Sequence, residues 1–391
     1  MDLRSAAHDL RSDLVAWRRH LHAHPELSYQ EEATAAFVRE RLEGLGLRAS
    51  APLAGGTGLT CLIEGQADGP TVALRADLDA LPIQEANDVP YASTVPGVGH
   101  MCGHDAHTTM LLGAAALLVR QRPARGHVKL LFQPAEEGGA GAARMIEDGA
   151  LDEPSVSAIF ALHVYPGVEV GHLTVSPGQA TAAADAFDIE VIGRGGHAAH
   201  PHQAIDAVAV AAHVVTALQL VVSRQTDPLL PLVLTIGKIE GGYARNVIAP
   251  SVRLAGTARS LDPALRERLP AMLEHVVGGV TQAFGASYTL AYQLGYPSTR
   301  NDPALLPTLE ATVAELLGEG RLSRKPPSMG GEDFAFYAER VPGLIARLGV
   351  RNEARGLVHP LHHPRFDLDE DALPLGAAVL AGFAQRYLHS A

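Results

Sequence analysis

The sequence of 391 residues is poor in cysteine, in tryptophan and in basic charge. Its two cysteines, Cys61 and Cys102, are too few for a disulfide framework, so any cysteine chemistry is that of a free thiolate. There are 31 Lys and Arg against 43 Asp and Glu, a net charge of −12, and no basic run is present. This balance argues against a nucleic-acid partner. With 47% hydrophobic residues, the composition gives no sign of disorder, and the length suggests two or three domains or one large domain with an insertion.

Long hydrophobic runs are missing too. The apolar run of residues 111–119 is too short to span a bilayer. The longer stretch of residues 207–222 is interrupted by His213 and Gln219. The first residues lack the basic and apolar regions of a secretory signal. We therefore expect a cytoplasmic protein without a membrane partner.

The first part of the chain alternates between helix-like and strand-like patterns. Apolar residues recur at three- and four-residue spacing in predicted helices over residues 13–22, 31–45, 106–120 and 141–148. Strand-like runs occupy residues 58–64, 71–78, 127–132 and 158–163. Asp105 is placed to cap the helix over 106–120. This alternation predicts an α/β domain with a largely parallel sheet.

The pattern changes near Pro177. From there the predicted order is strand, helix, strand, strand, helix, strand, over residues 187–192, 204–223, 232–240, 252–260, 263–284 and 287–292. This βαββαβ order is typical of a ferredoxin-like module. The α/β pattern then resumes with residues 303–317, 344–350 and 371–389. We predict a discontinuous catalytic domain of residues 1–182 and 294–391, interrupted by an inserted domain of residues 183–293.

Histidine is abundant, with 19 residues against 9 Phe and 1 Trp, and it is the commonest metal ligand. The densest segment is His100-Met101-Cys102-Gly103-His104-Asp105-Ala106-His107, directly before a predicted helix. On extended backbone, Cys102 and His104 face the same side, and Gly103 lets the chain bend around a shared ion. A bare Cys-x-His is more often structural, but three histidines and an aspartate around one cysteine favour a metal site.

Other ligand-type residues follow predicted strand ends, where the sites of open α/β sheets gather. Glu136 and Glu137 follow the strand that ends at Phe132. Adjacent carboxylates point in opposite directions, so one can bind metal while the other acts as a general base. Single histidines stand in Ala161-Leu162-His163 and Leu361-His362-His363-Pro364. A single histidine of this kind is more often a core or loop residue than a ligand. Because both follow predicted strand ends, as Glu136 and Glu137 do, we interpret them as candidates for the same site.

Two further clusters admit more than one interpretation. Asp77 and Asp79 end a strand on one face, and they could bind metal or orient a ligating histidine. The histidines of residues 20–24 suggest a metal site at first sight. However, residues two apart on a helix point away from each other and Pro25 breaks the helix, so a structural role is favoured.

A glycine-rich segment in the predicted insertion, residues 193–202, carries His197. Its glycines could project His197 outward, or the histidine could be an ordinary loop residue. The segment lacks the pattern of a phosphate-binding loop, and no G-x-S-x-G motif supports a serine hydrolase.

Together these motifs make the chain resemble the metal-dependent N-acyl-amino-acid amidohydrolases. That family includes hippurate hydrolases, plant indole-acetyl-amino-acid hydrolases and, more distantly, aminoacylase and the di-zinc carboxypeptidases. The matching motifs, which are spread over most of the chain, are H-P-E-L-S-x-x-E (24–31), R-A-D-L-D-A-L-P (75–82), H-M-C-G-H-D-x-H (100–107), Q-P-A-E-E (133–137), A-L-H-V (161–164), G-R-G-G-H-A-A-x-P-H (193–202), N-V-I-A-P (246–250), G-G-E-D-F-A-F-Y (330–337) and L-H-H-P (361–364).

The resemblance implies two divalent metal ions per subunit, with Cys102 as the bridging ligand where the carboxypeptidases use an aspartate. The remaining protein ligands implied are His104, Glu137, His163 and His362. His363 is the alternative to His362. Zinc is the first expectation, and manganese, cobalt and nickel also suit such ligands.

The resemblance also implies roles for residues that do not bind the ions. Glu136 would be the general base, and Asp77 would lie behind the ligands. His197 would reach into the active site of a partner subunit and stabilise the oxyanion, while Asn246 and Arg259 are candidates for substrate contacts.

The implied reaction is hydrolysis of N-acyl-L-amino acids of the acetyl, benzoyl or aryl-acetyl type to a carboxylic acid and an amino acid. The implied architecture is a di-metal exopeptidase-like α/β catalytic domain with an inserted ferredoxin-like domain. This domain would serve as a lid and hold a homodimer or higher homo-oligomer together. A dipeptidase or carboxypeptidase using the same site is an alternative. A metal-binding protein without catalysis is disfavoured because Glu136, which binding does not need, is present beside Glu137.

Overall fold

The computed structural model describes residues 2–390, which divide into two compact units. Unit 1 consists of residues 2–180, 300–326 and 333–390. Unit 2 consists of residues 181–299 and 327–332. The predicted inserted domain, residues 183–293, lies within unit 2, which also includes residues 181–182, 294–299 and 327–332.

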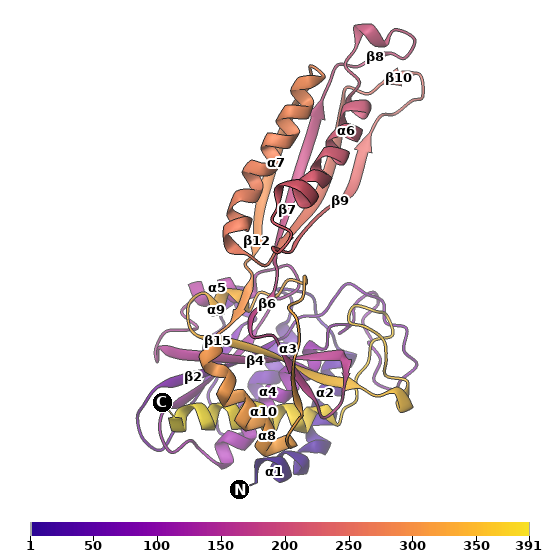
Figure 1. The fold of residues 1–391 in the computed structure, drawn as a ribbon. Helices are drawn as coiled ribbons and strands as arrows, with labels where there is room; N and C mark the ends of the chain where they lie inside the picture. The colour runs from indigo at the N-terminus through magenta and orange to yellow at the C-terminus, as the bar shows by residue number, and fades with distance from the viewer. Residues whose placement is uncertain (1, 391) are drawn as a thin grey trace. The chain divides into compact units, whose positions relative to one another are not determined.

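Unit 1 is built on a seven-stranded mixed sheet in the order β1-β3-β2-β4-β15-β5-β14. Figure 1 labels three of its strands, β2, β4 and β15. These strands are β1 (Leu59–Glu64), β2 (Thr71–Asp77), β3 (His127–Gln133), β4 (Val156–Glu169), β5 (Leu173–Val175), β14 (Leu322–Arg324) and β15 (Gly343–Arg351). The four central strands, β3, β2, β4 and β15, are parallel neighbours. The prediction of an α/β domain with a largely parallel sheet is confirmed, although β1 and β5 pair antiparallel with their neighbours β3 and β15.

Helices cover both faces of this sheet. They are α1 (Leu3–Asp9), α2 (Arg11–Ala23), α3 (Glu32–Gly44), α4 (His104–Arg120), α5 (Gly141–Glu147), α8 (Leu306–Leu317), α9 (Ala335–Ala338) and α10 (Ala372–Ser390). Short 3₁₀ turns lie at Ala54–Gly56, Pro303–Leu305 and Glu353–Arg355. Side chains of α4 and α10 share one core with alternate residues of β2, such as Leu74. Ala73, which points to the opposite face, packs with α5 and α9 in a second core.

The start of α4 corrects one prediction. The helix begins at His104, and the residue before it, Gly103, has a left-handed backbone with a φ of 83°. Asp105 therefore lies inside the first turn and is not the cap. Its carboxylate instead accepts hydrogen bonds from Arg18 and His22, which come from α2.

Unit 2 contains a four-stranded antiparallel sheet in the order β12-β7-β11-β9, covered by two helices. In chain order these elements are β7 (Ala183–Ile192), α6 (Ala207–Leu220), β9 (Leu232–Gly241), β11 (Ser251–Ser260), α7 (Pro263–Ala283) and β12 (Ser287–Tyr296). This is the βαββαβ order predicted from the sequence. Besides a π-helical turn that follows α6, the remaining elements are four short strands and one further 3₁₀ turn: β6 (Gly178–Thr181), β8 (Gly196–His197), Pro201–Gln203, β10 (Val247–Ile248) and β13 (Thr299–Asn301).

One helical stretch, Ala207–Gln225, is long and apolar enough to cross a membrane by length and composition. It consists of α6 and a π-helical turn, Val221–Gln225. Its buried residues Val210, Val214 and Leu218 recur at four-residue spacing and pack in the core of unit 2. A helix that covers a sheet explains the apolar residues of this buried face, whereas Val208 and Leu220 of the same helix are exposed.

Candidate metal centre

The predicted ligands come from separate segments of unit 1 that meet near the carboxyl ends of the parallel strands of its sheet. Parallel strands align their carboxyl ends, and the last residue of β2, Asp77, lies opposite the last residue of β3, Gln133. Glu136 and Glu137 follow β3, and His163 lies in β4. Cys102 immediately precedes the turn into α4. The fold thus places the candidate groups where an open α/β sheet gathers its active site.

Five predicted ligands contact one another in two groups that share Cys102. The ligand atoms of Cys102, His104 and His163 lie within 4.8 Å of one another, and so do those of Cys102, Glu137 and His362. The Cys102 Sγ is 3.6 Å from His163 Nε2. Glu137 Oε1 is 3.9 Å from His104 Nε2 and 3.4 Å from His362 Nε2. A shared thiolate between two donor groups is the arrangement that a bridging ligand requires.

Two atoms of this cluster bear directly on whether it fits a cation. Among residues 2–390, the buried His104 Nε2 and Glu137 Oε1 have no hydrogen-bond partner. A buried polar atom without a partner costs about 1–3 kcal/mol, unless a bound ion or water satisfies it. Because both atoms face other donor groups, a divalent cation would satisfy them together. The donor set fits the implied metal.

Burial sets the protonation of the sulfur and of one imidazole. Burial raises the pKa of the Cys102 thiol well above its usual value, so a thiolate there needs a positive charge beside it. Burial also lowers the pKa of His163 well below its usual value, which keeps the imidazole neutral. A neutral imidazole is the form that binds metals.

The ring orientations of His104 and His163 are fixed through their second nitrogens. His163 Nδ1 donates to the carbonyl of Val164 at 2.7 Å, which leaves Nε2 toward Cys102. His104 Nδ1 donates to Asp79 Oδ1 at 3.2 Å. Partners of this kind fix the tautomer of a metal-binding imidazole.

Asp79 holds more of the site than the sequence indicated. Besides His104, it accepts the backbone N–H groups of Glu136 and Glu137 at 3.1 and 2.9 Å and the hydroxyl of Ser28 at 2.7 Å. The resemblance placed only Asp77 behind the ligands. The signal for Asp79 was its place two residues after Asp77 on the same face of the predicted strand, although in the structure β2 ends at Asp77.

Asp77 lies beside the ligands but binds different groups. Its carboxylate accepts from Arg75 at 2.7 Å and from His107 Nδ1 at 2.5 Å, and its Oδ2 is 3.7 Å from His104 Nε2. His107 Nε2 accepts the N–H of Val164 at 2.8 Å. Both ring nitrogens of His107 are therefore hydrogen-bonded, and His107 connects β2 to β4.

Glu136 forms a third group with His104 and Glu137, and its side chain is buried. Its Oε1 accepts the backbone N–H of Asp333 at 3.3 Å. The preceding residue, Ala135, has a left-handed φ of 54°. Such backbone costs of order 1–3 kcal/mol and clusters at functional sites. This turn sets the direction of the adjacent carboxylates of Glu136 and Glu137.

The structure separates His362 from His363. His362 has a φ of 63°, its N–H donates to the Met101 carbonyl at 2.7 Å, and its side chain belongs to the ligand cluster. His363 stacks on His359 at 4.4 Å, and its Nδ1 accepts the N–H of Arg365. The geometry thus favours His362 as the ligand.

His197, Asn246 and Arg259 lie in unit 2. His197 is exposed in β8, and its Nδ1 accepts the N–H of Ala199 at 3.1 Å. The carbonyl of Asn246 accepts the N–H of Ala198, so these two segments are neighbours. Arg259 lies toward the far end of β11 and donates to the carbonyl of Met329 at 3.3 Å. None of the three belongs to the ligand groups, and their roles remain predictions.

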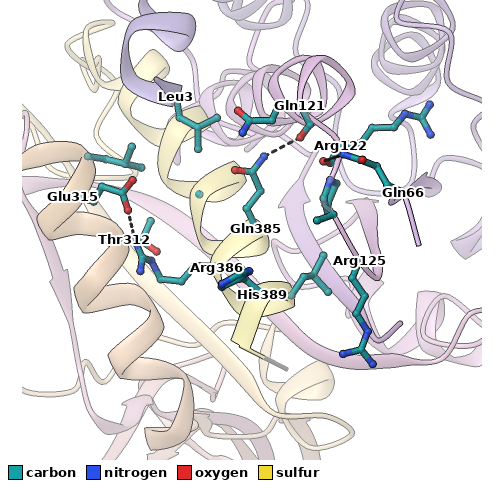
Figure 2. A pocket seen from close by; sticks show the side chains of 15 residues that line it. Leu3, Gln66, Gln121, Arg122, Arg125, Thr312, Glu315, Gln385, Arg386 and His389 are labelled. Carbon is teal, nitrogen blue, oxygen red and sulfur yellow. Dashed lines mark hydrogen bonds and ion pairs between the residues drawn. The ribbon is translucent and has the colours of Figure 1, made fainter. Parts of the chain in front are cut away.

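A pocket of about 530 Å³ lies elsewhere in unit 1, beyond the C-terminal end of α4. Figure 2 shows Gln385 donating to the carbonyl of Gln121 and Arg386 paired with Glu315 in its wall. None of the predicted site residues lines this pocket. The candidate metal centre and this pocket are therefore separate features of the unit.

Comparisons with known proteins agree with this geometry. The family model of Peptidase family M20/M25/M40 matches residues 73–386. An N-acyl-L-amino acid amidohydrolase of Geobacillus stearothermophilus is 46% identical over 75% of this chain and 80% of that protein. An N-acetyl-L-cysteine deacetylase of Bacillus subtilis is 40% identical over 97% of this chain and 89% of that protein. The crystal structure of a Bacillus subtilis dinuclear metal binding peptidase aligns with a TM-score of 0.86 and 35% identity, covering 98% of this chain and 99% of that one.

Proposed function

Because this chain belongs to Peptidase family M20/M25/M40, we propose that it is a metal-dependent amidohydrolase that cleaves the amide bond of N-acyl-L-amino acids. The products would be a carboxylic acid and a free amino acid. The amidohydrolase and deacetylase relatives support this activity. The observation that carries the proposal is the pair of ligand groups sharing Cys102, with Glu136 beside them.

Two divalent ions would be held by the shared thiolate of Cys102 together with His104, Glu137, His163 and His362. The dinuclear metal binding peptidase of similar structure supports the number of ions. Zinc is our first choice, and manganese, cobalt and nickel remain alternatives. When bound, such ions polarise the acyl carbonyl and bring the pKa of a bound water toward about 7.

Glu136 would carry the proton. Its carboxylate would accept a proton from the attacking water and deliver it to the nitrogen of the leaving amine. The N–H of Asp333 and the turn at Ala135 hold this carboxylate beside Glu137. Its burial near the ligand groups limits its contact with bulk water.

Unit 2 would supply the lid and the contact between subunits, with His197 donating to the oxyanion in the partner's site and Asn246 and Arg259 contacting substrate. The strand β9 lies at the edge of its sheet and exposes Val233 and Ile239. An edge strand with exposed apolar side chains is a template for pairing with another chain. Of the ten large hydrophobic residues exposed in residues 2–390, eight lie in unit 2, which supports a homo-oligomer formed there.

We also propose a cytoplasmic location. Both cysteines are free, and Cys102 must remain a thiolate to bind metal. A reducing compartment preserves such a ligand.

Hydrolysis of a substrate panel tests the proposed function. The purified protein would be reconstituted with each metal and given acetyl, benzoyl, indole-acetyl and aminoacyl derivatives of several amino acids. We expect hydrolysis of N-acyl-amino acids that a chelator abolishes. Turnover of the aminoacyl derivatives alone would instead indicate a dipeptidase, and no turnover by the metal-loaded protein would contradict the proposal.

A further inference from the structure

Arg18, in α2, is fully buried, which is rare for an arginine unless it is paired. Its Nε donates to Asp105 Oδ2 at 2.8 Å, and its Nη2 donates to Asp367 Oδ1 at 2.7 Å. Its Nη1 lies 3.6 Å from Glu370 Oε1. One rigid guanidinium therefore joins carboxylates from segments far apart in the sequence.

Both strongly bound carboxylates belong to segments that carry candidate metal ligands. Asp105 directly follows His104 in the first turn of α4. Asp367 follows His362 in the segment that leads to α10. The same two segments also meet at the ligands, where the N–H of His362 donates to the Met101 carbonyl. Arg18 thus links them a second time, behind the cluster.

We propose that Arg18 is a positioning residue that sets the spacing between Cys102 and His362 by tying Asp105 to Asp367. The proposal rests on the metal centre proposed above, because the two ligands it positions belong to the group of Cys102, Glu137 and His362. Arg18 does not touch the ligand cluster itself. It precedes the part of the chain that the family model matches.

The neighbours of Arg18 hold the same two carboxylates. His22 Nδ1 bonds to Asp105 Oδ2 at 2.7 Å and its Nε2 bonds to Glu85 Oε1 at 3.1 Å. Tyr91 donates its hydroxyl to Asp367 Oδ2 at 2.8 Å, and its ring lies 5.2 Å from the Arg18 guanidinium carbon. His22, one of the histidines of residues 20–24, thus supports the link that Arg18 makes between Asp105 and Asp367.

We expect Arg18 to contribute to the geometry of the metal centre rather than to the stability of the protein. Buried ion pairs often contribute little net stability, because taking the charges out of water offsets their attraction. Lysine keeps the charge of arginine but cannot reproduce its planar fork toward two acids. An Arg18→Lys variant therefore tests positioning while keeping the charge.

Metal titration of the full-length protein is the experiment. Zinc affinity would be measured by chelator competition, and the cobalt-loaded protein would report its thiolate coordination by absorption. We expect Arg18→Lys to weaken binding of the ion among Cys102, Glu137 and His362 about tenfold or more, because that is the usual effect of losing a residue that supports metal ligands. The absorption spectrum of the cobalt-loaded protein should change as well. Arg19→Lys is the matched control, because Arg19 is 44% exposed and pairs with Glu370 and the ring of Tyr91 rather than with Asp105 or Asp367.

Asp367→Asn keeps the proposal testable if Arg18→Lys fails to fold, because it leaves the pair of Arg18 and Asp105 in place. It should weaken the same ion. Wild-type affinity and spectrum in a folded Arg18→Lys or Asp367→Asn variant would overturn the role of Arg18. Failure of the wild-type protein to bind two ions would instead contradict the proposed metal centre.

Discussion

Unit 1 and unit 2 each contain a candidate site histidine that directly follows a glycine, and the environments of these two histidines are opposite. His104 is fully buried, and a carboxylate, Asp79, holds its Nδ1. His197 is exposed, and its Nδ1 bonds only to the backbone of its own loop among the described residues. The imidazole of His104 is thus held in one orientation by the residues around it, whereas the imidazole of His197 is exposed to solvent.

The same contrast extends to charge. Almost all buried ionisable side chains of residues 2–390 lie in unit 1, whereas unit 2 buries only Asp185 and Glu332 among its Asp, Glu, His, Lys and Arg residues. Burying charges is costly unless they are paired, so a dense network of them is expected where geometry is needed for function. Unit 1 thus holds the candidate chemistry, and unit 2 offers exposed apolar and loop residues.

The largest effect is expected from Glu136→Gln in unit 1. The amide preserves the shape but removes the base, so kcat should fall by about 10²–10⁴-fold while the metal content stays unchanged. Turnover and elemental analysis of the same sample check this. A kcat close to wild type would contradict the assignment, and loss of metal would show that Glu136 and Glu137 have exchanged roles.

Cys102→Ser should weaken both ions together, because Cys102 belongs to both ligand groups. A hydroxyl is a far poorer bridging ligand than a thiolate, so most activity should be lost. Metal titration decides the matter. Cys61→Ser is the matched control, because Cys61 lies in β1 away from the ligand groups. Two ions bound with wild-type affinity to Cys102→Ser would rule out the bridge.

Asp79→Asn should lower metal affinity or activity by about 10–100-fold, because Asp79 orients His104 and anchors the glutamate loop. Asp77→Asn provides the comparison, since Asp77 hydrogen-bonds His107 and lies 3.7 Å from His104 Nε2 without a hydrogen bond to it. We expect the metal affinity of the Asp79 variant to fall further. Equal metal affinities of the Asp79→Asn and Asp77→Asn variants would contradict the larger role of Asp79 in holding the metal ligands.

A mixture of His197→Asn and Glu136→Gln subunits should regain activity if unit 2 acts across subunits. Hybrid dimers would contain one complete site, so free exchange should restore about a quarter of wild-type activity. Each homodimer alone is the control. No recovery despite hybrids detected by mass spectrometry would confine His197 to its own subunit, and a monomeric protein would contradict the shared site.

The smallest effect concerns pH. Burial and Arg18 lower the pKa of His22, but Asp105 and Glu85 outweigh them and raise it above its usual value. A pKa raised in the folded state stabilises the protein fully below the unfolded value of about 6.5, and this stability is lost as pH rises through the folded pKa. The melting temperature of metal-free His22→Gln should therefore fall less with rising pH than that of the wild type. The exposed His24→Gln variant should follow the wild type.

The sequence marked the candidate ligands because most of them stand at the end of a predicted strand or just before a predicted helix, positions that converge in a parallel sheet, and the resemblance supplied their separate roles. It could not choose between Asp77 and Asp79, since an alternating pattern puts both on the same face of the predicted strand, and only the structure shows that β2 ends at Asp77 and that their tertiary contacts differ. It was wrong about Asp105 as a helix cap, because the competing partner, Arg18, comes from a helix 87 residues earlier.

The short strands β5 and β14 escaped sequence analysis for a different reason. Each has three residues, too few for an alternating pattern to emerge. Their pairing is set by neighbouring strands, and so is the antiparallel direction of β1. The resemblance already named His362 with His363 as the alternative, and the left-handed φ of His362, which no residue type in this segment signals, adds support for that choice.

The most direct test of the account is to locate the ions in crystals of the metal-loaded protein by anomalous scattering. We expect two ions, one among Cys102, His104 and His163 and the other among Cys102, Glu137 and His362, with the sulfur of Cys102 bound to both. A single ion, or two ions of which neither contacts Cys102, would contradict it.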